Sequence, residues 1–150
     1  MLSFEKLDPY SRRFAERLFT TYPQWRTLAF VDPEGGPPPG SLELAVPSPV
    51  AGRELRIRTY ANQITVDFGP HGWHDHFGEG SSVDERAIFE SAVAFISDLL
   101  AERVVVATHF FFGRPWWSRP MRTDRLRKPL VGRIEAYSWS GGRDAILGWR

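Results

Sequence analysis

Apolar residues recur at three- and four-residue spacing between Val83 and Glu102, which is the period of an amphipathic α-helix. Ser82 and Glu85 form an S-x-x-E capping box, and Asp84 adds a negative charge to the first turn, where the helix dipole favours it. So wide an apolar face predicts a sheet packed beneath the helix. Its residues are Ile88, Phe89, Ala92, Val93, Phe95, Ile96, Leu99 and Leu100.

A second, shorter helix is predicted from Pro9 to Thr20. Asp8 is a good N-cap residue, and a proline suits the first helical position because its missing N–H would have no partner there. Pro23 ends the pattern. The apolar positions at four-residue spacing are Tyr10, Phe14, Leu18 and Tyr22.

Alternating apolar and polar positions predict a series of strands. The most regular are Glu54–Tyr60 and Gln63–Phe68, and Ala61-Asn62 suits a tight turn between them, so we expect a hairpin. The segment Asp32–Gly40 is rich in proline and glycine and is predicted to be a loop. The other predicted strands are Trp25–Val31, Ser41–Val46, Val104–Phe112, Val131–Trp139 and Ala145–Trp149, with the last two forming a hairpin around residues 140–143.

This order of elements predicts a fold of the α+β class. Strands follow one another without regular alternation with helices, which argues against a doubly wound α/β fold. We expect residues 1–150 to form a single domain, in which an antiparallel sheet of about six or more strands packs against the long helix. The shorter helix lies at the N-terminus. The pattern assigns neither a strand order nor an oligomeric state.

The composition is that of a globular chain and narrows the function classes. Hydrophobic residues make up 42% and charged residues 25%, and the absence of cysteine excludes disulfides and thiolate zinc sites. No apolar stretch is long enough to span a membrane, and the start MLSFEKLDPY lacks the apolar core of a signal peptide. We therefore expect a cytoplasmic protein with no membrane association.

Three of the four histidines fall in the run His71-Gly72-Trp73-His74-Asp75-His76. Imidazole and carboxylate groups are ligands for zinc, nickel or iron, and alternate residues of a strand project from one face. One hypothesis is therefore a small metal-dependent hydrolase that uses His71, His74, Asp75 and His76. In the second hypothesis, this hairpin binds a partner through the aromatic anchors Trp73 and Phe77 and through hydrogen bonds from His74, Asp75 and His76. In the third, the histidines are simply structural.

A second feature is the basic segment Arg114–Lys128, which begins with Arg114-Pro115-Trp116-Trp117-Ser118-Arg119 and holds six basic residues against the single acid Asp124. Basic residues interleaved with tryptophans are typical of nucleic-acid interfaces. The same composition suits a protein interface through Trp116, Trp117 and Arg119, or a loop that lays its tryptophans over a sheet edge. The formal net charge of only +1 makes nucleic acid the least favoured partner.

Recognisable catalytic motifs are absent from the sequence. It has no G-x-S-x-G elbow, no phosphate-binding glycine loop followed by lysine, and no H-E-x-x-H. We therefore assign no catalytic residue and no cofactor, and the sequence favours binding over catalysis.

The run ITVDFGPHGWHDHFGEG, the helix VDERAIFESAVAFISDLLAER and the strand VVVATHFFFG together resemble a group of small bacterial proteins. In that group a strand ending in Asp-Phe leads to an H-x-H-F hairpin and a helix. Some of its members resemble immunity proteins encoded beside polymorphic toxins. The resemblance covers about a third of the chain and implies an inhibitor that binds and neutralises one cognate toxin domain. The matching residues are Asp67, Phe68, His74, His76 and Phe77.

Overall fold

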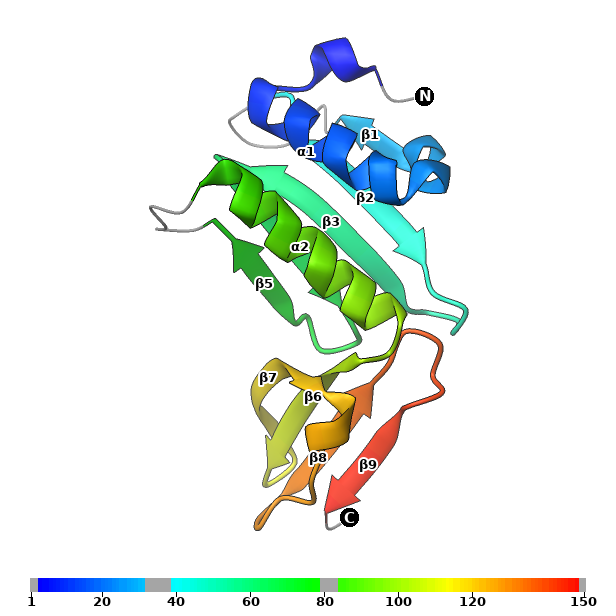
Figure 1. The fold of residues 1–150 in the computed structure, drawn as a ribbon. Helices are drawn as coiled ribbons and strands as arrows, with labels where there is room; N and C mark the ends of the chain where they lie inside the picture. Colours follow the sequence, from blue (N-terminus) through cyan, green and yellow to red (C-terminus); the bar gives the residue numbers. More distant parts are fainter. Residues whose placement is uncertain (1–2, 32–38, 79–83, 149–150) are drawn as a thin grey trace. The chain divides into compact units, whose positions relative to one another are not determined.

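Two antiparallel sheets and two α-helices make up the chain in the computed structural model, which describes residues 3–31, 39–78 and 84–148 (Figure 1). The chain divides into two compact units. Unit 1 comprises Met1–Val46, Glu54–Asp67 and His74–Ala94, and unit 2 comprises Pro47–Arg53, Phe68–Trp73 and Phe95–Arg150. The predicted α+β class is confirmed. The prediction of a single domain over residues 1–150 stays a prediction.

Unit 1 is built on a five-stranded sheet in the order β1-β2-β3-β4-β5. Alternate residues of β3 are buried and exposed, as the period-two pattern predicted. The predicted hairpin is present, because Ala61 and Asn62 both adopt positive φ and form a tight turn between β3 and β4. The strands are β1 (Ala29–Val31), β2 (Leu42–Pro47), β3 (Glu54–Tyr60), β4 (Gln63–Phe68) and β5 (His74–Phe77).

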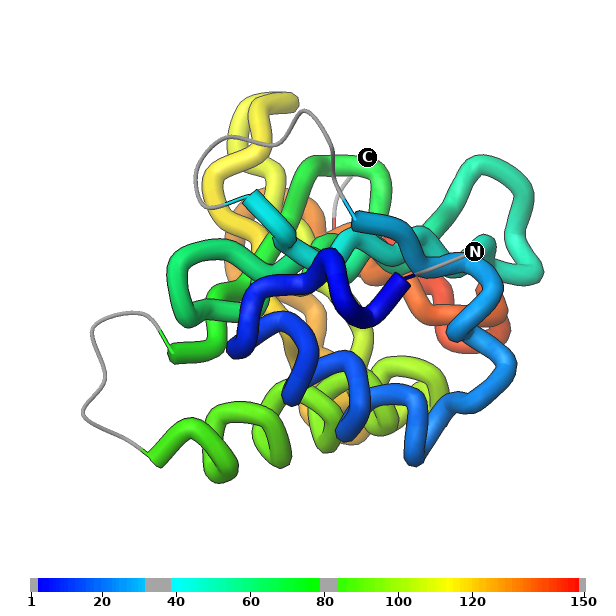
Figure 2. The backbone as a smooth tube through the Cα atoms, turned by 90° about the horizontal axis from the view of Figure 1, so that it is seen from above, coloured from blue at the N-terminus to red at the C-terminus, as the bar shows by residue number. Residues whose placement is uncertain are grey.

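Helix α1 (Pro9–Thr21) and residues 85–94 of helix α2 (Glu85–Leu100), which belong to unit 1, lie side by side on the same side of this sheet (Figures 1 and 2). The Phe89 ring lies 5.2 Å from the Tyr10 ring and 5.4 Å from the Phe14 ring. At the solvent edge, the Arg13 guanidinium donates to Glu85 at 2.7 and 2.8 Å. The buried aromatic contacts therefore hold the helices together, since exposed ion pairs contribute little.

The predicted N-cap of α1 is confirmed. The Asp8 carboxylate accepts a hydrogen bond from the Ser11 backbone N–H at 2.9 Å, and Pro9 occupies the first turn. The predicted capping residue of α2, Ser82, lies outside the described residues. At its other end α2 stops at Leu100, because Glu102 adopts φ +55° and the Arg103 N–H donates to the Asp98 carbonyl at 2.9 Å, which closes a Schellman-type end.

Unit 2 contains a separate four-stranded sheet in the order β7-β6-β8-β9. The prediction of one antiparallel sheet with six or more strands is therefore corrected to two smaller sheets, of five and four strands, whereas the predicted long helix and the shorter N-terminal helix are both present as α2 and α1. Strand β6 is buried along almost its whole length, as expected for its β-branched sequence. The strands are β6 (Val104–Phe111), β7 (Arg114–Arg122), β8 (Arg133–Tyr137) and β9 (Ala145–Gly148).

The predicted strand Trp25–Val31 is only partly correct, because β1 begins at Ala29. Residues Pro23–Thr27 form a 3₁₀ helix, η2, in which proline occupies the first turn. Trp25 is buried and stacks on Tyr22 with ring centroids 4.2 Å apart. Local stacking and the proline turn thus outweigh the strand preference of an aromatic residue. The other two 3₁₀ helices in the described chain are η1 (Phe4–Lys6) and η3 (Thr123–Arg125).

Tyr10 carries a hydroxyl that is buried without a hydrogen-bond partner among the described residues. Tyr10→Phe is therefore expected to leave the free energy of unfolding unchanged or to raise it by up to about 1 kcal/mol, because no hydrogen bond is lost. Burial first, and then the nearby Glu85 carboxylate, raise the pKa of Tyr10 to about 12.

This raised pKa predicts a loss of stability in alkali. The folded pKa lies above the ordinary value of about 10, so the neutral phenol stabilises the fold fully below pH 10 and progressively less towards pH 12. Urea unfolding at neutral pH and at pH 11 is expected to show a smaller alkaline loss for Tyr10→Phe than for the wild type. Tyr60→Phe, at an exposed position, is the control. A clear destabilisation of Tyr10→Phe at neutral pH would contradict the prediction.

Candidate binding surfaces

Strand β5 places its two histidines on the outer face of the unit 1 sheet. His74 pairs with Asp67 and His76 pairs with Thr65, and both imidazoles are exposed, with ring centroids 5.0 Å apart. The Thr65 hydroxyl lies 3.0 Å from His76 Nδ1, which fixes that ring. The predicted strand face that carries both histidines is thus present, and Asp75 points to the opposite face.

Trp73 is not an exposed anchor, which corrects the predicted binding hairpin. Its side chain is only 6% exposed and packs on Phe95 with ring centroids 5.6 Å apart. Phe77 is half-buried at the end of β5. The sequence predicted a partner-contacting tryptophan because Trp73 stands beside polar histidines. In the structure, the large apolar surface of the Trp73 side chain is buried within unit 2 instead.

The four-residue metal set is not formed. His71 belongs to unit 2, where its Nε2 lies 3.0 Å from the Tyr137 hydroxyl and 3.5 Å from the Glu135 carboxylate. Within the described ranges, no group of three or more histidine or acidic side chains is placed to hold a metal ion. The metal hypothesis assumed that neighbours in sequence meet in space, but Gly72, at positive φ, turns the chain between His71 and β5.

The segment Arg114–Arg122 is a strand, β7, which corrects the alternative of a loop that lays its tryptophans over a sheet edge. Among the described residues β7 is an edge strand that pairs with β6 alone, and an edge position tolerates the missing N–H groups of Pro115 and Pro120. The register shifts between His109 and Phe110, so that Trp116 is the extra residue of a β-bulge.

The bulge and the adjacent turn create an exposed aromatic cluster, which we call the aromatic tip and which consists of Phe111, Phe112 and Trp116. Phe112 is 89% exposed and Trp116 is 66% exposed. The Phe111 ring lies 4.4 Å from Phe112 and 5.6 Å from Trp116, so the three side chains form one apolar patch. Of these residues, only Trp116 had been predicted from the sequence.

Trp117 and Arg119 have a more structural role than predicted. Arg119 lies over the Trp117 ring at 4.4 Å, and the same ring packs on His109 at 5.3 Å. His109 is buried, and its Nε2 donates to the Val131 carbonyl at 2.8 Å. Trp117 therefore covers the strand centre, while Trp116 alone of the two tryptophans is directed largely to solvent.

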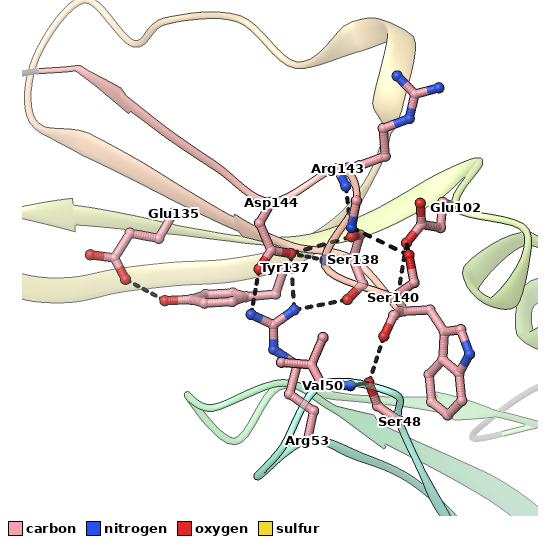
Figure 3. A network of polar contacts seen from close by, with 12 residues as sticks. Ser48, Val50, Arg53, Glu102, Glu135, Tyr137, Ser138, Ser140, Arg143 and Asp144 are labelled. Atoms are coloured by element: carbon pink, nitrogen blue, oxygen red, sulfur yellow. Dashed lines mark hydrogen bonds and ion pairs between the residues drawn. The ribbon is translucent and has the colours of Figure 1, made fainter.

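A polar network fixes the loop between β8 and β9 (Figure 3). The Asp144 carboxylate accepts from Arg53 at 2.9 Å and from the Ser138 backbone N–H at 2.8 Å. Burial raises the pKa of Asp144, but these bonds to Arg53 and Ser138 outweigh it and hold the pKa below the ordinary value. In the same loop, Glu102 accepts from the Ser140 N–H at 2.7 Å. The polar groups of this network satisfy one another's hydrogen-bonding capacity, which indicates that they stabilise the loop.

The outer face of the unit 1 sheet contains a pocket of about 340 Å³ that sequence reasoning missed. It crosses four neighbouring strands, and its polar walls come from residues that alternate with the buried core positions. The alternation of β3 and β4 in the sequence predicts which of their side chains point to the outer face, and so it could have indicated these pocket residues. The lining residues are Ser41, Leu42, Glu43, Arg58, Thr59, Tyr60, Gln63, Thr65, His74 and His76.

Comparison of the chain with protein-family models, curated proteins and solved structures gave no match. The resemblance to immunity proteins therefore stays a prediction. In the part of the chain that the structure describes, no helix has the length and apolar character needed to cross a membrane.

Proposed function

We propose that this chain is a protein-binding module of the immunity type, which binds and neutralises a cognate bacterial toxin domain through the aromatic tip. The observation that carries the proposal is the position of Phe112. This residue occupies a two-residue turn with φ +49°, followed by Gly113 at φ +73°. Such turns favour asparagine and glycine, and a bulky residue at positive φ costs about 1–3 kcal/mol.

Phe112 is thus unfavourable for the fold in two respects, since it is strained and exposes a large apolar ring to water. A partner that covers the ring accounts for both features. Aromatic and arginine side chains are enriched at the centres of protein interfaces, and Arg114 and Arg119 lie on the strand that follows this turn.

The charge around the tip favours an acidic partner surface. Exposed basic residues dominate the segment Arg114–Lys128, and its one acid, Asp124, is already paired with Arg122 at 3.2 Å. Electrostatic complementarity of this kind raises the association rate and its dependence on salt. The edge of β7 is a poor template for a strand of the partner, because Pro115 and Pro120 lack N–H donors.

The substitution Phe112→Asn distinguishes a role of Phe112 in partner binding from a role in stability, because it is expected to affect the two in opposite directions. We expect it to raise the free energy of unfolding by about 1 kcal/mol, because asparagine tolerates positive φ. The affinity for the partner is expected to fall by about 30-fold or more, as for other interface hot spots. The measurement is co-expression with the toxin-like domain encoded by the adjacent reading frame, followed by calorimetric titration and a growth-rescue assay.

Ile146→Ala is the matched control, since it removes an exposed apolar side chain from β9 of the same unit. It is expected to leave binding and rescue unchanged, whereas Trp116→Ala is expected to resemble Phe112→Asn. Full affinity of Phe112→Asn for the partner would overturn the proposal. Salt-sensitive binding of a single-stranded oligonucleotide that is lost in Trp116→Ala would instead favour nucleic acid as the ligand.

A further inference from the structure

The pocket on the outer face of the unit 1 sheet brings together polar groups that the fold itself does not use. The Glu43 carboxylate, the Tyr60 hydroxyl and the Gln63 amide make no side-chain hydrogen bond or ion pair with any described residue, although all three line the pocket. The volume of about 340 Å³ falls at the lower end of the usual range for small-ligand sites, roughly 300–1,000 Å³.

Opposite charges line this pocket without neutralising each other. Arg58 pairs through one nitrogen with Asp67 at 3.0 Å, and its other guanidinium nitrogens have no partner in the described chain. Glu43 comes from β2, and no ion pair joins it to Arg58 or to any other described residue. One wall therefore offers a hydrogen-bond acceptor with negative charge, and a neighbouring wall offers donors with positive charge.

The histidine side of the pocket is pre-organised. Thr65 is buried, and its hydroxyl bonds His76 Nδ1 at 3.0 Å, so that the remaining ring nitrogen, Nε2, is held in a defined direction. A ring fixed in this way loses little conformational entropy when it binds a ligand. Tyr60, about half exposed at the end of β3, supplies an aromatic surface at the rim.

We propose that this pocket binds a small zwitterion of the α-amino-acid class. The ligand ammonium is placed against Glu43, and the ligand carboxylate accepts hydrogen bonds from Arg58. A ligand with only one charge leaves the opposite wall unpaired, and an ion that loses water without gaining a partner weakens binding. The pocket volume accommodates an amino acid together with a side chain that contacts Tyr60 and His76.

Calorimetric titration with each of the standard amino acids tests the proposal. At least one is expected to bind with a dissociation constant below about 1 mM. Its N-acetyl derivative, which lacks the ammonium group, and its amide, which lacks the carboxylate, are expected to bind at least about tenfold more weakly. These analogues test both walls on the wild-type protein and so require no variant to fold.

Variants then locate the site. Glu43→Gln and Arg58→Met are each expected to weaken binding at least about tenfold. Their matched controls are Glu54→Gln and Arg56→Met, because these residues lie on the same face of β3, pair with each other and do not line the pocket.

The proposal is overturned if no amino acid binds at up to about 10 mM. It is also overturned if both blocked analogues bind as well as the parent amino acid, or if all four variants weaken binding equally. None of these results bears on the aromatic tip, which lies in unit 2 and is tested with a protein partner.

Discussion

Gly132→Ala is expected to lower the free energy of unfolding by about 3–5 kcal/mol, which is a large part of the total stability of a typical domain. Gly132 adopts φ +77°, and a Cβ atom there would lie 2.2 Å from the Phe110 carbonyl oxygen and 2.9 Å from His109 Nε2. The first of these atoms belongs to the backbone of the central strand β6 and has little room to move.

The expected loss has two sources. An alanine at positive φ costs about 1 kcal/mol or more, and relief of the clash requires a shift of the chain beside β6. Such a shift also breaks the hydrogen bond from His109 Nε2 to the Val131 carbonyl, which leaves a buried imidazole with no partner and costs about 1–3 kcal/mol more.

Gly113→Ala is the control, because Gly113 has a similar φ of +73° but a Cβ atom there meets nothing within 4 Å. Its expected cost is only about 1 kcal/mol, from the backbone conformation alone. Urea unfolding of both variants, followed by tryptophan fluorescence and circular dichroism, measures the difference. Equal losses of unfolding free energy in the two variants would contradict the prediction, because they would show that the contact between the new Cβ atom and the Phe110 carbonyl is relieved without cost.

Elements with a strong local signal were predictable from the sequence. The cap of α1 follows from Asp8 and Pro9, and the β3–β4 hairpin follows from strict alternation around Ala61-Asn62. In each case the residues that determine the structure are neighbours in sequence, so tertiary contacts reinforce the local preference. The division of the strands into two sheets has no such signal, since it depends on pairing between distant segments.

The candidate sites were less predictable because exposure is a tertiary property. Trp73 and Trp116 were both predicted to be binding residues from the sequence, yet the first is buried on Phe95 and the second is exposed by a bulge. The strand β7 was not among the predicted strands, and its two prolines fit a strand only because it lies at a sheet edge. The pocket was missed because its walls come from four strands, and no single segment indicates it.

The network around Asp144 predicts the second large effect, a loss of about 2–3 kcal/mol in the free energy of unfolding for Asp144→Ala. Breaking a buried ion pair costs about 3–5 kcal/mol, and the partial exposure of the Asp144 side chain, 34%, reduces that figure. The variant leaves Arg53, whose side chain is only 14% exposed, without its carboxylate, and it removes the acceptor for the Ser138 N–H.

Acid conditions provide an independent test of this network. The folded pKa of Asp144 lies below its ordinary value, so the carboxylate stabilises the fold above about pH 4 and this contribution is lost as the pH falls through the folded pKa. The difference in unfolding free energy between wild type and Asp144→Ala is therefore expected to be constant from pH 7 to about pH 5 and to shrink towards pH 2.

Asp124→Ala is the matched control, because Asp124 pairs with Arg122 on the surface, where both side chains are more than half exposed. Its removal is expected to give no measurable change in stability, since solvent and salt screen such a pair. Urea unfolding at a series of pH values measures both variants. If the two variants lose stability equally, or if the loss in Asp144→Ala is the same at pH 2 as at pH 7, the carboxylate does not hold the loop through its ionised form.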